Sequence, residues 1–295
     1  MGILGAFFGL AFVAVVFGLL ERFFPATRAP RERGSRWVDL CHFLVARITE
    51  LVGQVAVLLT IAFYALALGW GHMPFEKWFA MRTAVFTHLP HPIQVVVALV
   101  VIDFYGYWIH RIQHARPFWR FHAVHHSSTR LDWLGSVRNH PVADLFGKVA
   151  IVPPLLGLGI DARVITVLVP ILGLWAVFIH ANVPWGFGPL RYVIATPLFH
   201  RWHHASDREA QDKNFAGFFP VWDLVFGTFH CPRRQPLAFG AVNADGSTVP
   251  PGFFAQLAYP FRESRYDHLA WRSPSASSPI STSGPPRITT ASCGS

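Results

Sequence analysis

Apolar residues form five runs along the chain, and the first three are long enough to predict membrane helices. They cover residues 1–20, 51–69 and 93–109, and the only charged side chain within them is Asp103. About twenty consecutive apolar residues suffice for an α-helix to cross the hydrocarbon core of a bilayer. The first run lacks the basic start and the small-residue cleavage site of a signal peptide, so we expect it to be retained as a helix.

The last two runs are shorter and contain prolines. They cover residues 149–160 and 164–179, and Pro153, Pro154 and Pro170 interrupt them. Because proline removes a backbone donor and kinks a helix, these runs predict a helical hairpin. The hairpin consists either of two full spans or of partly inserted helices. In both cases it returns the chain to the side of the bilayer from which it started.

The composition and the positions of the basic residues place these runs in a membrane. Hydrophobic residues make up 52% of the chain and charged residues only 14%, which is atypical of a soluble domain. Arginine and lysine gather in residues 22–36, 111–148 and 191–234, and these segments are expected to be cytoplasmic. Basic loops beside anionic headgroups account for the net charge of +9, so no nucleic-acid partner is needed.

Ten of the 16 histidines form a pattern that predicts a metal site. One H-x3-H motif and two H-x2-H-H motifs carry eight of them, and two single histidines lie between the motifs. Residues three or four apart share one face of a helix, and neutral imidazole is a common metal ligand. Because ten imidazoles exceed the ligand number of one ion, the pattern favours two ions in one pocket. The expected ligands are His110, His114, His122, His125, His126, His140, His180, His200, His203 and His204.

The other six histidines and the cysteines carry no comparable signal. His42, His72, His88, His91, His230 and His268 are isolated, and we interpret them as core or surface residues. Cys41, Cys231 and Cys293 form no C-x-x-C motif, so neither a disulfide nor thiolate ligation is indicated.

Acidic and amide side chains near the motifs are candidates for orienting the ligands. A metal-bound histidine usually donates its second N–H to a carboxylate or a carbonyl. Asp103 is seven residues before His110, roughly 10 Å along a helix axis, so we expect it to orient a ligand from another helix. As an ionisable residue in an apolar helix it is costly to insert and therefore expected to be functional. The main candidates are Asp103, Asn182, Asp212, Asn214 and Asp223, with Asp132 and Asp207 also considered.

The motifs and their order resemble the fatty acid hydroxylase and sterol desaturase superfamily of membrane di-iron oxygenases. Beyond the histidine motifs, residues 103–111 (DFYGYWIHR) resemble the family's first box, and residues 138–141 (RNHP) its R-x-H-P element. Residues 180–183 (HANV) resemble its H-x-N element, and residues 222–228 (WDLVFGT) the segment that closes the domain. The resemblance covers about residues 95–230.

We therefore expect an all-α integral membrane protein with about four to five membrane helices. A cytoplasmic helical cap would hold the dinuclear metal site, in the inner membrane of a bacterium or the endoplasmic reticulum of a eukaryote. The expected organisation is N-terminal membrane helices in residues 1–92, a catalytic domain in residues 93–240 and a C-terminal extension in residues 241–295. The Ser/Thr/Pro-rich composition from about residue 273 predicts disorder.

The resemblance implies that the histidines bind two irons, which activate O2 against a C–H bond of a lipid. Zinc could replace iron in purified protein. The lipid, the choice between hydroxylation and desaturation, and the oligomeric state stay open. The chain has no motif of a fused cytochrome b5, ferredoxin or dinucleotide-binding domain, so electrons are expected from a separate cytochrome b5-, ferredoxin- or flavoprotein-type donor. The alternative is a metal-binding membrane protein without redox chemistry, either a zinc hydrolase or a metal carrier.

Overall fold

The computed structural model describes residues 3–28, 34–67, 77, 86, 88–158, 160, 162–241 and 247–262, and this part of the chain is helical. It contains no β-sheet within these ranges, where one isolated bridge joins Ala205 to Phe239. The all-α fold class predicted from the sequence is therefore confirmed for the described residues.

Three long helices correspond to the second, third and fifth apolar runs. They are α2 (Ser35–Ala67), α4 (His91–His114) and α8 (Ala162–His180). Residues Ser35–Tyr64, His91–His114 and Arg163–His180 are long and apolar enough to cross a membrane. Large apolar side chains such as Leu58, Leu59 and Phe63 are exposed along α2. An apolar surface of this extent is unfavourable in water and suits contact with lipid.

The first run forms α1 (Ile3–Phe23), which is packed along one face only. Phe17 is buried against Ala181 and Val183, which directly follow α8. Phe8 and Phe12 on the opposite face are exposed. That α1 crosses a bilayer stays a prediction.

The fourth run does not form a membrane span. It is divided between α6 (Pro141–Ala150) and α7 (Val152–Leu158), and neither helix is long enough to cross a bilayer. The cause is the Pro153-Pro154 pair, which has no N–H to continue the hydrogen bonds of α6 but fits the first turn of a new helix. Of the predicted hairpin, only α8 could span, and it continues through Pro170. The described residues thus give three candidate spans where four to five were expected.

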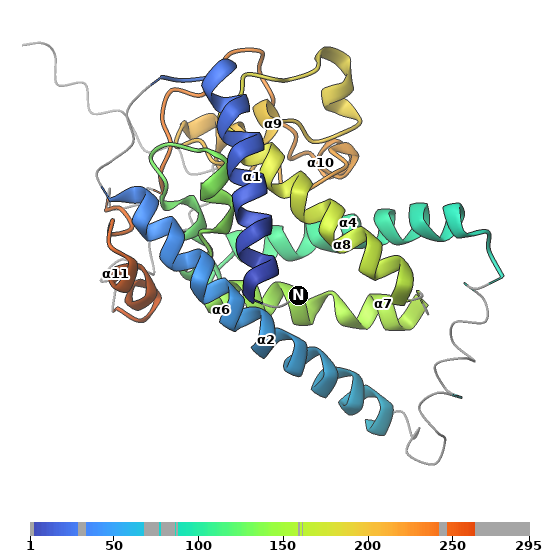
Figure 1. Ribbon diagram of the computed structural model, residues 1–295. Coiled ribbons are helices and arrows are strands. Elements are labelled where there is room, and N and C mark those ends of the chain that lie inside the picture. The colour runs from blue at the N-terminus through green and yellow to red at the C-terminus, as the bar shows by residue number, and fades with distance from the viewer. Residues whose placement is uncertain are drawn as a thin grey trace, which may run out of the picture.

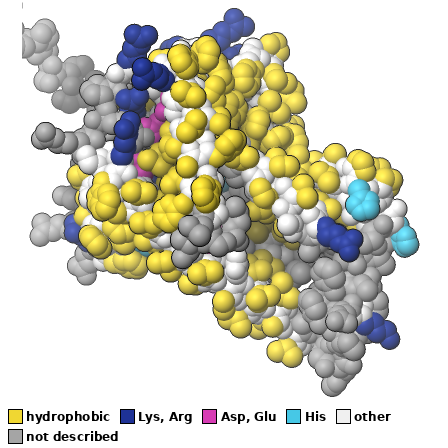
Figure 2. Space-filling view, in the orientation of Figure 1, with side chains coloured by type: hydrophobic (Ala, Val, Ile, Leu, Met, Phe, Trp, Pro, Cys, Tyr) yellow, Lys and Arg dark blue, Asp and Glu magenta, His cyan; other side chains and the backbone are white. Residues whose placement is uncertain are grey.

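Short helices form a cap at the end of the molecule where α1 ends, α2 begins and α8 ends (Figure 1). They are α5 (Trp119–His122), η2 (His125–Ser127), η3 (Trp133–Val137), η4 (Gly188–Tyr192), α9 (Pro197–His203), η5 (Arg208–Ala210), α10 (Val221–Val225), α11 (Phe253–Ala258) and η6 (Tyr259–Phe261). Figure 2 shows that most Lys and Arg side chains of the visible face gather at this same end, whereas much of the rest of the face is hydrophobic. This distribution matches the charge bias read from the sequence.

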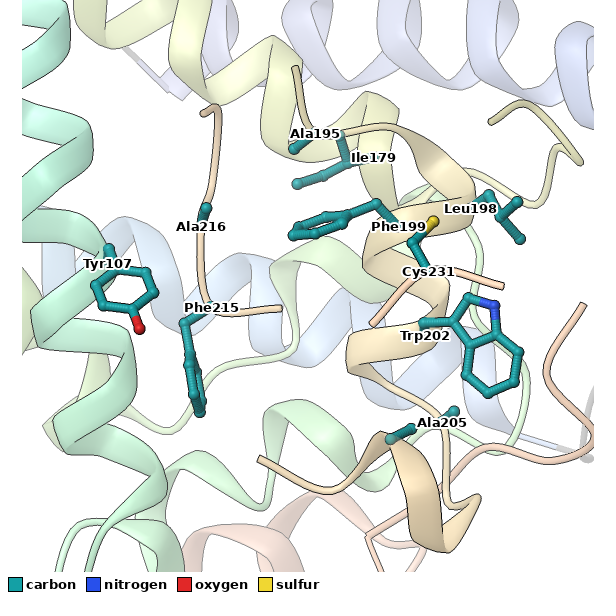
Figure 3. Close-up of a cluster of buried hydrophobic side chains, with 11 residues drawn as sticks. Tyr107, Ile179, Ala195, Leu198, Phe199, Trp202, Ala205, Phe215, Ala216 and Cys231 are labelled. Atoms are coloured by element: carbon teal, nitrogen blue, oxygen red, sulfur yellow. The ribbon is translucent and has the colours of Figure 1, made fainter. Parts of the chain in front are cut away.

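The apolar core of the cap is built on α9 (Figure 3). Phe199 and Trp202 point into a cluster with Cys231, and Tyr107 of α4 meets Phe215 ring to ring at 5.9 Å. Burying each large side chain contributes about 1.5–3 kcal/mol. The same short helix carries His200 and His203, and His204 directly follows it. Packing of α9 therefore fixes where these three imidazoles point.

The predicted C-terminal extension begins as part of this cap. Gln256 of α11 is fully buried, and its Oε1 lies 2.9 Å from Nε2 of His42 in α2. His42 is thus a core residue, as interpreted from the sequence. The disorder expected from about residue 273 lies outside the described residues.

The orientation can be tested by cysteine labelling in a background from which the native cysteines have been removed. Lys77→Cys should react with a membrane-impermeant thiol reagent in intact cells, because the loop before α4 is predicted to be external. Leu237→Cys, at a cap position that is 85% exposed, should react only after permeabilisation. The reverse labelling would overturn the cytoplasmic placement of the cap.

Candidate metal centre

Nine of the ten predicted histidines converge in the structure, and they form two groups. The first group is His110, His114, His122, His126 and His203, and the second is His125, His180, His200 and His204. Within each group, one nitrogen from every ring lies within 4.8 Å of the corresponding nitrogens of the others. α4, α5, η2 and α9 supply the first group. Segments that are distant in sequence thus present their imidazoles to two common points.

The distances between the ring nitrogens fit ligands of a metal ion. Nε2 of His122 lies 3.1 Å from Nε2 of His110 and 3.3 Å from Nε2 of His126. In the second group, Nε2 of His180 lies 3.2 Å from Nε2 of His125 and 3.1 Å from Nε2 of His200. Metal–nitrogen bonds of about 2.0–2.1 Å separate adjacent ligand nitrogens by roughly 2.9–3.4 Å in octahedral or tetrahedral geometry. The observed spacings lie in this range.

The two groups are adjacent because the motifs contain neighbouring histidines. In each of the pairs His125-His126 and His203-His204, one residue joins each group. The rings of His126 and His204, which belong to different groups, stack with their centroids 4.3 Å apart. Two metal positions beside each other would follow directly from the H-H dipeptides.

Burial keeps these imidazoles in the neutral form that can bind a metal. Desolvation, reinforced by the neighbouring imidazoles, lowers the pKa well below the ordinary value of 6.5 for His122, His125, His126, His200, His203 and His204. Nε2 of His114 and Nε2 of His203 are buried without a hydrogen-bond partner among the described residues. An unsatisfied buried polar atom costs about 1–3 kcal/mol, which a metal bond would offset. The donor set therefore fits a metal centre.

Backbone carbonyls fix the direction of several rings through Nδ1. His110 Nδ1 lies 2.8 Å from the Phe215 carbonyl, His125 Nδ1 3.0 Å from that of Arg138, His180 Nδ1 2.6 Å from that of Ala176, and His203 Nδ1 2.8 Å from that of Lys213. A carbonyl can only accept, so each Nδ1 must carry the proton and donate it. Nε2 then keeps its lone pair for a metal.

Among the acidic and amide candidates, Asp212 contacts a histidine of the first group. Its Oδ1 lies 3.4 Å from Nδ1 of His114, and its backbone has a φ of 54°, in the left-handed region. Asp103 and Asp223 act one step away from the histidines. Asp103 accepts hydrogen bonds from the N–H groups of Phe218 and Phe219, both at 2.8 Å, and from Nε1 of Trp222.

Within the described residues, Asp103 thus contacts Phe218, Phe219 and Trp222 rather than a histidine, and its influence on a ligand stays a prediction. Asp223 accepts from the backbone N–H groups of Phe215 and Ala216 at 2.8 and 2.9 Å, and burial raises its pKa. Together the two carboxylates satisfy the N–H groups of an irregular loop that would otherwise be unpaired in an apolar environment. Since His110 donates to the Phe215 carbonyl of this loop, the carboxylates hold the acceptor rather than the ligand.

The amides and the remaining acids also have structural partners. Asn214 donates to the carbonyls of Phe199 and His230 at 2.9 and 2.6 Å, and it directly follows Lys213. Asn182 donates to the Thr27 carbonyl at 2.8 Å and so ties the chain after α1 to the end of α8. Asp132 caps η3, and Asp207 accepts from the N–H of Leu237.

His140 is the one predicted ligand that the structure does not bring to either group. Its Nδ1 accepts from the N–H of Val142 at the start of α6, and its Nε2 lies 3.1 Å from the Leu257 carbonyl. Both ring nitrogens are therefore engaged with the backbone, and none is left for a metal. A single histidine before proline suits a helix cap as well as a ligand, and the motif alone could not separate these roles.

An important ion pair, between Asp39 of α2 and Arg138, was missed by the sequence analysis. Both are buried, and Nε and Nη2 of Arg138 lie 2.7 and 2.6 Å from Oδ1 of Asp39. Nδ1 of His42, one turn further along α2, lies 3.1 Å from the Asn139 carbonyl. The pair positions the Arg138 carbonyl that meets His125. The available signal was an acidic residue and a histidine three positions apart in an otherwise apolar segment.

The comparisons with known proteins identify the family. The fatty acid hydroxylase family model matches residues 95–228, which include both histidine groups. The ornithine lipid hydroxylase OlsE of Rhizobium tropici is 32% identical over 261 residues, or 85% of this chain and 74% of that protein. This chain belongs to the fatty acid hydroxylase family.

Other relatives match a shorter part of the chain. Human alkylglycerol monooxygenase is 35% identical over 139 residues, which are 47% of this chain and 31% of that enzyme. A very-long-chain aldehyde decarbonylase of rice, GL1-6, is 29% identical over 189 residues, which are 58% of this chain and 27% of the rice protein. The chain therefore spans only about a third of these two longer relatives. No solved structure matches it.

The ligand set can be tested with a matched pair of histidine variants. His204→Ala should lower the metal affinity by about 10–100-fold or more, because it removes a nitrogen from the second group. His140→Asn keeps a side-chain acceptor for the start of α6 and should retain the full metal content. Metal analysis of the two purified proteins, side by side, checks both expectations; equal metal content in the two variants would contradict the assignment.

The Asp39–Arg138 pair can be tested by a double-mutant cycle. Asp39→Asn leaves a buried guanidinium unpaired and should destabilise the protein by about 3–5 kcal/mol. Adding Arg138→Met should recover part of this loss, since no unpaired charge is then buried. Thermal unfolding in detergent measures the stability of the two single variants and of the double variant. Additive effects of the two substitutions would show that the pair is not coupled.

Proposed function

We propose that this protein is a membrane-bound di-iron oxygenase that hydroxylates a lipid. The observation that carries the proposal is the pair of adjacent imidazole groups, buried at the end of helices that can cross a membrane. The names of its relatives, an ornithine lipid hydroxylase and an alkylglycerol monooxygenase, favour oxygen insertion into a lipid over desaturation.

The residues of the chain have separate tasks in this proposal. Nine imidazoles would hold two irons, which when bound supply the activation of O2 against a C–H bond. The carbonyls of Phe215, Arg138, Ala176 and Lys213 fix the tautomer and the direction of four ligands. The buried cap around the centre limits water access, and the membrane helices give a lipid a route that does not leave the bilayer.

We propose that electrons come from a separate donor protein of the cytochrome b5, ferredoxin or flavoprotein type. The motifs of such domains are missing from the sequence. The concentration of Lys and Arg around the cap, visible in Figure 2, supports a cytoplasmic position for the centre, where such donors are reduced.

A zinc hydrolase or a metal carrier is less well supported. Catalytic zinc needs about three protein ligands and an open position, whereas the first group alone brings five imidazoles together. A carrier requires ligands spaced along a path through the membrane, whereas these nine are concentrated in the cap and at the adjoining ends of α4 and α8.

The proposal is tested by oxygen uptake and product mass with the purified full-length protein. Iron-loaded protein given a chemical reductant and a polar lipid extract should consume O2 and add the mass of one oxygen atom to a lipid. His204→Ala should lose this turnover by several orders of magnitude, whereas His140→Asn should keep it within about an order of magnitude. Iron-loaded protein that consumes no O2 with any lipid fraction, together with hydrolytic products formed by the zinc-loaded protein, would contradict the oxygenase assignment.

A further inference from the structure

An open groove of about 390 Å³ lies between α4 and α6, a volume within the range of small-molecule sites. One stripe of α4 forms one wall, and one stripe of α6 forms the other. The groove is adjacent to the candidate metal centre, because His110, one of its lining residues, belongs to the first histidine group. Near His110, Gln113 donates from Nε2 to the Ala143 carbonyl at 2.9 Å and so links the two walls.

Two glycines line this groove, and their lack of a side chain leaves its space open. Gly106 lies one turn before His110, and a Cβ added there would meet no atom within 4 Å. Gly147 on α6 is similar, since its nearest neighbour would be Nε2 of Gln113 at 4.0 Å. A larger side chain at either position would therefore occupy the groove rather than clash with the backbone. Ile102, Ile109 and Ile151 supply the apolar surface that an aliphatic chain needs.

An ion pair lines the same groove beside a membrane helix. Nζ of Lys148 lies 2.6 Å from Oδ2 of Asp144, and Thr49 of α2 donates to the same oxygen at 2.8 Å. The aliphatic part of Lys148 covers Gly53 of α2, where an added Cβ would lie 3.0 Å from its Cδ. Thr49 and Gly53 belong to a segment that can cross the bilayer. The ion pair is thus packed against a helix that is long and apolar enough to cross a membrane.

The two charged side chains are still accessible. Lys148 is 35% and Asp144 24% exposed, and both line the groove. Side by side, they offer a hydrogen-bond donor with positive charge and an acceptor with negative charge. A purely anionic headgroup would be repelled by Asp144, and a purely cationic one by Lys148. A headgroup that carries both charges complements both residues.

We propose that this groove binds the aliphatic chain of a lipid and that Asp144 and Lys148 select a zwitterionic polar group. The groove then presents the lipid to the metal centre at His110. That the bound lipid is also the substrate rests on the proposed oxygenase function. Binding itself does not, because the groove residues other than His110 belong to neither histidine group.

The test compares four lipids with the same oleoyl or oleyl chain and different charges. Nα-oleoyl-lysine is zwitterionic, oleate anionic, oleylamine cationic and methyl oleate neutral. Native mass spectrometry of the full chain from uncharged detergent measures their binding, and metal content is read from the same preparations. The wild type should bind the zwitterion about tenfold more tightly than each of the other three, as expected for charge-assisted hydrogen bonds.

Four variants separate recognition of the chain from recognition of the headgroup. Gly106→Leu should weaken all four lipids, whereas Gly173→Leu, at a helix position that is equally open but outside the groove, should bind like the wild type. Lys148→Met removes the charge but keeps the aliphatic packing on Gly53. Lys148→Met and Asp144→Asn should each abolish the preference for the zwitterion. If either single variant fails to fold, the doubly neutral Asp144→Asn/Lys148→Met protein should show the same loss of preference.

The outcomes distinguish this proposal from the oxygenase proposal. Equal binding of methyl oleate and the zwitterion by the wild type would overturn the role of the ion pair, and so would an undiminished preference in Lys148→Met. Binding by Gly106→Leu equal to that by Gly173→Leu would overturn the groove as the lipid site. All these results can be obtained whether or not the protein turns over, and the metal content shows independently whether the histidine centre is intact.

Discussion

The structure depends on one constraint, which is that nine imidazoles must be buried together with one nitrogen of each ring pointing inward. A neutral imidazole has one donor and one acceptor nitrogen, so an inward lone pair leaves the proton on the other nitrogen, which can donate it to an acceptor. In four of the rings the acceptor is a backbone carbonyl, and in His114 it is Asp212. The cap is therefore a frame for carbonyl groups as much as for histidines.

Carbonyls in irregular loops need support of their own, and charged side chains supply it. Asp103 and Asp223 hold the loop that presents the Phe215 carbonyl, and the Asp39–Arg138 pair holds the segment that presents the Arg138 carbonyl. Two of these acids lie on membrane helices, α2 and α4. The cost of burying their charge is offset by the hydrogen bonds they accept. The membrane helices and the cap are thus one structural unit around the centre.

Sequence periodicity predicted the helices, and histidine spacing predicted the nine histidines that converge, because helix formation and the spacing of residues on one helix face depend on local geometry. They failed where the outcome depended on tertiary contacts. The run at residues 149–160 has the hydropathy of a membrane segment, but its two prolines divide it. His140 resembles a ligand in its motif, but its Nε2 lies within hydrogen-bond distance of the carbonyl of Leu257, which is 117 residues away. The carbonyls that orient the imidazoles leave no trace in the sequence, since every residue has one.

The central claim, a dinuclear centre with imidazole ligands, is tested most directly by X-ray absorption at the iron edge of the iron-loaded full-length protein. The account predicts a first shell of nitrogen and oxygen at about 2.0–2.2 Å, the outer-shell scattering of several imidazole rings, and a further iron neighbour. Iron without an iron neighbour and with little imidazole scattering, in protein whose histidines are intact, would contradict it.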